Sequence, residues 1–289
     1  MQHARPLVVL SLAVLCFASG AAAAPAPHDP KGQMDEIFFL SGLEEQLRIL
    51  SDGLGAGLAP HIQQLPAPQA QALERAILRE FSRDALQRAV EARLERAYDA
   101  RNASAVLIWL RSPLGRRISK LEIAASSADA AREMQSYAQL IQTESGAPPA
   151  ARVALIASLE EATGMSDFTV DLSLTSALAT ALGVNGALPV EHRADEDEIR
   201  AGIEAQRPML RAQIQQVTQI AMLYSYRSLS DPELRDYVAF ASGGPGQWYH
   251  GVVKSALLDA IVRASLRVGE SVATDLREMP SPLPASPAQ

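Results

Sequence analysis

The chain repeats two short patterns in its two halves, and this repetition constrains the fold more than any other feature. Residues 109–115 (WLRSPLG) correspond to residues 240–246 (FASGGPG), and residues 39–45 (FLSGLEE) correspond to residues 155–161 (LIASLEE). Because both patterns occur in the same order, the sequence predicts that one ancestral helical unit was duplicated.

The two patterns are not separated by the same distance. The turn pattern recurs after 131 positions, whereas the upstream pattern recurs after 116 positions. The second unit therefore holds about 15 more residues between the patterns, and we expect them in a loop over residues 184–198.

The composition predicts an all-α fold. Hydrophobic residues make up 48% of the chain and aromatic residues only 5%, and Ala and Leu, which favour helices, dominate over β-branched residues. We expect two tandem units of about four to five helices each. The sequence leaves open whether these units are separate domains or pack as one body around a pseudo-twofold axis.

The first residues have the pattern of a secretory signal peptide. A short polar start with His3 and Arg5 precedes an apolar stretch over residues 7–17 and small residues at 18–24. The apolar stretch is too short to span a bilayer. We expect cleavage after residue 23 and a location in the periplasm or outside the cell. Cys16, the only cysteine, would be lost, so the mature chain would form no disulfide.

The remaining organisation follows from the Pro-rich and Gly-rich segments. Residues 1–23 are the expected signal peptide and residues 24–32 a flexible lead-in. The two helical units are expected over residues 33–144 and 151–277, joined by a linker over 145–150, and residues 278–289 are expected to form a disordered tail.

Apolar periodicity and capping residues predict individual helices within the units. The expected helices cover residues 34–51, a segment opened by Pro66 and Pro68, a segment capped by Ser82, residues 102–110, Pro113 to Thr143, a segment ending at Thr163, a segment from Ser166 to Leu182, residues 199–226, a segment capped by Ser230 or Asp231, and residues 247–276.

The turn patterns resemble those of bacterial exported proteins that carry the domain of unknown function 2059. That pattern joins an acidic helix start with Glu-Leu to a Phe-Tyr-x-Ser-Pro-x-Gly turn. The second half keeps the upstream part, and the first half keeps the downstream part. The matching residues are Ser230, Asp231, Glu233, Leu234 and Phe240, and then Trp109, Ser112, Pro113 and Gly115. Both halves lack the Tyr. The resemblance implies an all-helical exported domain and carries no activity.

The candidate binding residues lie at or beside the turns. Trp109 and Phe240 either plug a helix junction or line a groove at the helix elbow. Arg116 belongs to a small basic group that either contacts an anionic partner or faces solvent. Trp248, Tyr249 and His250 form the densest aromatic and polar cluster, which either anchors the last helix or lines a pocket.

No known catalytic motif or metal-ligand spacing occurs in the sequence. The histidines that remain after the signal are scattered, and Asp195–Glu198 fits a helix start better than a cation site. We therefore predict no cofactor and no metal. The net charge of −7 makes nucleic acid a poor partner, and no second apolar run is long enough to span a membrane.

These observations favour a non-catalytic binding or interaction module of the cell envelope. Its partner would be an envelope protein or an apolar or anionic ligand. One alternative is a carrier that holds an apolar ligand between amphipathic helices, which needs a sizeable apolar cavity. The other is a hydrolase with a dispersed His and carboxylate site, which needs polar residues to converge in a cleft.

Overall fold

The computed structural model describes residues 29–49, 51–52, 67–143, 146–187, 190 and 193–278, and their regular structure is helical throughout. The all-α prediction is therefore confirmed. The helices are α1 (Pro30–Leu40), α3 (Ala67–Glu80), α4 (Arg83–Arg96), α5 (Ala100–Arg111), α6 (Pro113–Ala125), α7 (Ala128–Leu140), α8 (Ala150–Thr163), α9 (Met165–Ala187), α10 (Glu196–Glu204), α11 (Arg207–Ser225), α12 (Asp231–Ser242) and α13 (Gly244–Glu278). The expected signal peptide and most of the lead-in and tail lie outside the described residues.

A sharp elbow joins α5 to α6. Ser112 has an extended backbone (φ −66°, ψ 156°), its hydroxyl accepts a hydrogen bond from the Gly115 N–H at 2.9 Å, and Pro113 occupies the first turn of α6. An N-cap hydroxyl followed by proline satisfies an exposed helix start. The predicted capping role of Ser112 is confirmed.

The elbow between α12 and α13 has the same geometry. Gly243 takes the place of Ser112, with φ −72° and ψ 159°. A Cβ added at Gly115 would lie 2.1 Å from the Trp109 carbonyl oxygen, and one added at Gly246 would lie 2.1 Å from the Phe240 carbonyl oxygen. Both elbows therefore require a residue without a side chain at this position.

The helices that enter the two elbows also correspond in their buried positions. Residues of α5 and α12 separated by 131 positions face the protein interior in the same way. The corresponding pairs of buried residues are Ala103 and Leu234, Val106 and Tyr237, and Leu110 and Ala241.

A second pair of matching turns ends α1 and α8. Gly42 (φ 74°) follows α1 and Gly164 (φ 58°) ends α8; these are the positive-φ positions among the described residues. The continuous helix predicted over residues 34–51 is therefore wrong, because the left-handed turn at Gly42 interrupts it. The pairing of residues 39–45 with 155–161 is also out of register: Glu44 follows its glycine turn, whereas Glu160 precedes Gly164.

Three further helix boundaries differ from the sequence-based expectation. The segment from Pro113 to Thr143 is two helices, because Ser127 caps α7 by accepting from the Ala130 N–H at 3.1 Å. The segment over 199–226 breaks between α10 and α11, beside the proline in the first turn of α11. The sequence also suggests Ser166 as the N-cap of a helix to Leu182, but α9 begins at Met165, directly after Gly164, and continues to Ala187 into the expected loop.

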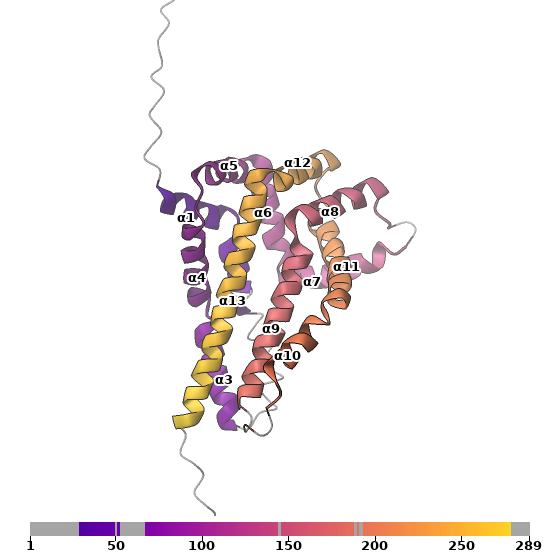
Figure 1. Cartoon of the computed structure of the whole chain (residues 1–289). Coiled ribbons are helices and arrows are strands. Elements are labelled where there is room, and N and C mark those ends of the chain that lie inside the picture. Colours follow the sequence, from indigo (N-terminus) through magenta and orange to yellow (C-terminus); the bar gives the residue numbers. More distant parts are fainter. Residues whose placement is uncertain are drawn as a thin grey trace, which may run out of the picture.

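The two halves pack as one interleaved body. α13 runs through the middle of the molecule, with α3 and α4 on one side and α9 on the other (Figure 1). Residues of α13 complete the core formed by the first half, and Ile118 of α6 lies in the core formed by α8, α11 and α12. The α13 residues in the first core are Ala256, Ala260, Ile261, Ala264 and Val268.

The interleaving is reciprocal. α13, which follows the second elbow, packs on α4 of the first half, and α6, which follows the first elbow, packs on α11 of the second half. α4 and α11 are the helices that directly precede α5 and α12. Each half thus contributes the helix after its elbow to the other half.

Candidate functional site

Trp109 and Phe240 lie at the junction between the two cores. Their rings stack with centroids 4.4 Å apart and planes 6° apart, and Trp109 also stacks on Tyr237 at 6.0 Å. Both residues pack against both cores. Both side chains are partly buried, and they fill the helix junction, which is one of the two roles expected from the sequence.

Trp248, Tyr249 and His250 occupy the first turns of α13. Trp248 and Tyr249 pack against the first core. The Nε2 atom of His250 is buried and has no described hydrogen-bond partner. Burial, together with the nearby Lys254 ammonium, lowers the pKa of His250 to about 4. Of the two roles expected from the sequence, anchoring the helix or lining a pocket, these contacts favour the anchoring of α13.

The basic group after the first elbow holds parts of the protein together. Arg116 is exposed and donates to the Arg111 carbonyl oxygen. Arg117 donates to a Glu233 carboxylate oxygen and to the Ser228 carbonyl oxygen, both at 2.6 Å. These contacts tie α6 to the start of α12.

The pocket that combines a partly buried ammonium with carboxylates lies between α9 and α13. We call it the α9–α13 pocket. It has a volume of about 250 Å³ and receives polar and apolar side chains from both helices. Its lining residues are Gly164, Asp167, Phe168, Asp171, Lys254, Ser255 and Leu258.

The glycine turn before α9 positions Lys254. The Nζ of Lys254 donates to the Thr163 carbonyl oxygen at 2.6 Å. A Cβ added at Gly164 would lie 2.7 Å from this Nζ, so the lysine reaches its position because residue 164 has no side chain. Burial lowers the pKa of Lys254, and the nearby Asp167 and Asp171 carboxylates oppose this by raising it.

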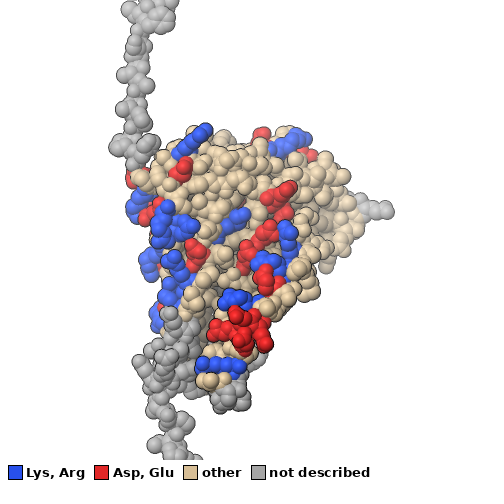
Figure 2. Space-filling model, in the orientation of Figure 1, with Lys and Arg blue, Asp and Glu red and all other residues tan. Residues whose placement is uncertain are grey.

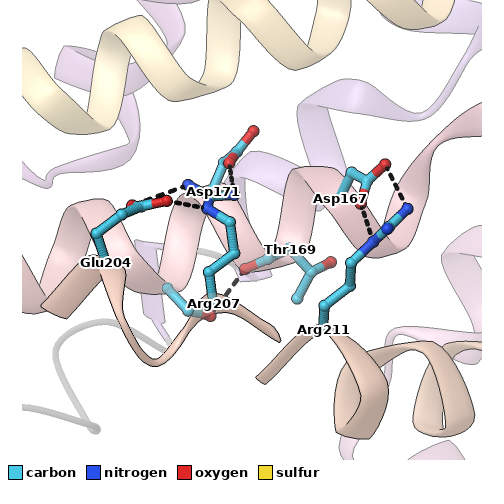
Figure 3. Close-up of polar contacts among 7 residues, drawn as sticks. Asp167, Thr169, Asp171, Glu204, Arg207 and Arg211 are labelled. Carbon is cyan, nitrogen blue, oxygen red and sulfur yellow. Dashed lines mark hydrogen bonds and ion pairs between the residues drawn. The ribbon is translucent and has the colours of Figure 1, made fainter. Parts of the chain in front are cut away.

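Two arginines of α11 hold the carboxylates of the pocket. Arg211 donates from Nε to Asp167 at 2.7 Å, and Arg207 donates from Nη1 to Asp171 at 2.7 Å while it also pairs with Glu204 (Figure 3). Because Asp167 and Asp171 lie four residues apart, they lie on the same face of α9. Side chains of both charges gather along α9 and α10 in Figure 2.

The first half places an apolar residue where the second half places Lys254. A Cβ added at Gly42 would lie 2.6 Å from the Cδ1 of Ile123, just as one added at Gly164 would meet Lys254. Ile123 and Lys254 are separated by the same 131 positions as the elbows. Packing against the glycine turn therefore accepts an aliphatic side chain, and it does not require an ammonium.

A second pocket, of about 300 Å³, lies between α6, α7 and the end of α11. Its polar groups are engaged with one another. The Tyr224 hydroxyl donates to Glu133 at 2.6 Å, and the Arg227 guanidinium lies 3.9 Å from the centre of the Tyr224 ring. This pocket differs from the α9–α13 pocket in that its cation, Arg227, is exposed and stacks on Tyr224, whereas Lys254 is partly buried.

A buried carboxyl lies in the second core. Glu122 Oε1 accepts hydrogen bonds from the hydroxyls of Tyr226 and Tyr237, both at 2.8 Å. Burial raises the pKa of Glu122, and these two hydrogen bonds lower it. The rings of the two tyrosines meet edge to face at 5.6 Å, so the cluster links α6 to α11 and α12.

Sequence reasoning did not select Lys254, Asp167 or Asp171 as binding residues. The signal available was the 131-position spacing, which aligns Lys254 with Ile123 and so identifies a charge that the packing does not need. The pairing of Asp167 and Asp171 with α11 depends on tertiary structure and has no local signal.

Two other kinds of site are absent from the described ranges. Across them, no group of three or more His, Cys, Asp and Glu side chains has a metal-binding arrangement. The described helices also include none with the length and hydropathy that a bilayer span requires. No protein-family model, curated protein or solved structure matches the chain.

Proposed function

We propose that the protein is a non-catalytic binding module of the cell envelope and that it binds a small polar ligand in the α9–α13 pocket. The observation that carries the proposal is the position of Lys254. The corresponding residue of the first half, Ile123, makes the same packing contact without a charge. The Lys254 ammonium uses one donor on the Thr163 carbonyl oxygen at the end of α8, and its other N–H groups leave donors for a ligand in the pocket that it lines.

The character of the pocket separates this proposal from the two alternatives. Its lining includes Lys254, Asp167 and Asp171, which suit a polar ligand better than the apolar ligand of a carrier. The hydrolase alternative requires histidines or carboxylates that converge in a cleft and exchange protons with a substrate, and among the histidines His250 lies within the described residues. His250 is instead held neutral by burial, with its pKa lowered to about 4.

The proposal includes export and an internal duplication. The duplication is supported by the matched elbows at Ser112 and Gly243 and by the left-handed turns at Gly42 and Gly164. Export rests on the expected signal peptide over residues 1–23 and on the resemblance to exported proteins with the domain of unknown function 2059.

The test compares the small molecules that co-purify with the exported protein and with its Lys254→Ile variant. The variant copies the packing of Ile123 and removes the ammonium. We expect mass spectrometry of the denatured proteins to find a polar molecule released from the wild type and at least tenfold less from the variant. Equal release from both proteins would contradict the proposal. Conversion of the released molecule by the wild type alone would favour the hydrolase.

A further inference from the structure

We infer that the ligand of the α9–α13 pocket is a small zwitterion of the α-amino-acid type. Its carboxylate would bind the Lys254 ammonium, and its own ammonium would face Asp167 and Asp171. This inference rests on the proposed binding role of the pocket and adds the chemical class of the ligand.

Opposite charges face the α9–α13 pocket without forming an ion pair with one another. Lys254 bonds to the Thr163 carbonyl oxygen, and Asp167 and Asp171 pair with arginines on the far side of α9. The two carboxylates still attract the ammonium, because both raise the pKa of Lys254. A molecule that carries both charges can bridge this separation.

The charges of a zwitterion match those of the pocket better than the charge of a simple anion or a simple cation does. The described hydrogen bond of Lys254 uses one of the three N–H groups of its ammonium. A carboxylate would satisfy another and restore an ion pair to a partly buried cation. A simple anion would lie beside Asp167 and Asp171, whose charges Arg211 and Arg207 partly offset, and a simple cation would lie beside Lys254. A zwitterion places each of its charges beside an opposite one.

The size and lining of the α9–α13 pocket also suit an amino acid. A volume of about 250 Å³ corresponds to roughly eight water molecules in the liquid, which suits an amino acid and is small for a larger cofactor. Phe168 and Leu258 give the pocket an apolar wall. We therefore expect amino acids with aliphatic side chains to bind best.

The experiment measures binding to the mature chain by calorimetry. The probes are L-leucine, N-acetyl-L-leucine, which lacks the ammonium, and L-leucinamide, which lacks the carboxylate. We expect leucine to bind and each blocked form to bind at least tenfold more weakly. Since these three measurements use the wild-type protein, they do not depend on whether any variant folds.

Two variants then test whether leucine binds at Lys254. Lys254→Ile should weaken leucine binding at least tenfold, whereas Lys120→Ile, which removes an exposed lysine of α6, should leave it unchanged. The inference is overturned if leucine does not bind, if both blocked forms bind as tightly as leucine, or if Lys254→Ile binds leucine normally.

These results also separate the inference from the proposed function. If leucine fails and the molecule that co-purifies in a manner that depends on Lys254 is not an amino acid, only the zwitterion assignment is wrong. If neither leucine nor any co-purifying molecule responds to Lys254→Ile, the binding role of the pocket is wrong as well.

Discussion

The indole ring of Trp109 lies face to face with the phenyl ring of Phe240, with 4.4 Å between the ring centres. The two residues are 131 positions apart and occupy the same place before their elbows. The stack therefore joins equivalent positions of the two halves, and it lies where the two cores meet.

Removing this stack should destabilise both cores at once. We expect Trp109→Ala to lower the free energy of unfolding by about 3–5 kcal/mol, as for other large aromatic side chains in protein cores. Ile108→Ala is the control, because Ile108 is 72% exposed on the same helix and should change stability by less than about 0.5 kcal/mol. Urea unfolding followed by circular dichroism measures both. Equal losses would show that Trp109 is not a core residue.

The elbow glycines should tolerate no side chain. Gly115→Ala and Gly246→Ala each force a Cβ toward a carbonyl oxygen 2.1 Å away, and we expect each to cost at least about 1–3 kcal/mol. Gly251→Ala, within α13, meets no atom within 4 Å and should instead stabilise the helix by about 0.5–1 kcal/mol. Thermal unfolding distinguishes them, and a neutral Gly246→Ala would refute the close approach.

Arg152 should contribute more stability than an exposed arginine. Its side chain is 14% exposed, pairs with Asp231 at 2.7 Å and donates to the carbonyl oxygens of Tyr226 and Leu229 at 2.7 and 3.0 Å. Arg152→Met leaves these acceptors without their donor, and we expect a loss of about 2 kcal/mol or more. Arg132→Met breaks an ion pair that is 81% exposed on both sides and should cost less than about 1 kcal/mol. Similar melting temperatures for the two variants would contradict this ranking.

Glu122 should make stability depend on pH in a defined direction. Burial raises the pKa of Glu122 in the folded protein, so the folded state favours the protonated carboxyl. The protonated Glu122 carboxyl contributes fully to stability below the pKa that it has in the unfolded state. This contribution is lost as the pH rises through its higher pKa in the folded state. Glu122→Gln removes this titration and can still accept from Tyr226 and Tyr237. Urea titrations from pH 4 to pH 8 should show the stability of the variant rising relative to wild type; a relative decline would exclude the raised pKa.

His250 should make stability depend on pH in the direction opposite to that of Glu122. Burial lowers its pKa from 6.5 to about 4, so the unfolded state binds the proton more tightly. The stabilising contribution is complete above pH 6.5 and is lost as the pH falls toward 4. It amounts to up to about 3 kcal/mol. The His250→Phe variant should lose less stability than wild type between pH 7 and pH 4 in the same titrations. An identical acid dependence would mean that His250 is accessible to water in the folded protein.

Serines that precede helices were correctly predicted to cap them, because capping depends only on residues close in the sequence. Ser82, Ser112 and Ser230 cap their helices as expected, and Ser230 forms a capping box with Glu233. The errors occurred at helix breaks that are short in sequence. The break after Ser126 has no glycine or proline. Gly42 and Pro208 lie at the other two breaks, but a single glycine or a proline in the first turn also occurs within a continuous helical pattern.

The site was harder to predict than the fold. Trp109, Phe240 and Tyr249 were reasonable candidates by residue type, and the structure shows them partly buried and packed against the cores. Lys254 forms its pocket because Gly164 turns the chain and because α9 lies beside α13. Neither condition can be recognised in the residues near Lys254 in the sequence.

The position of α13 has a consequence for the order of folding. This helix spans residues 244–278 and supplies Ala256, Ile261 and Val268 to the core that residues 34–110 begin. A growing chain that has not yet received these residues leaves that core open on one side. Because α13 supplies part of this core, the interior of the amino-terminal half closes only after α13 has joined it. Contacts between residues so distant in the sequence form slowly.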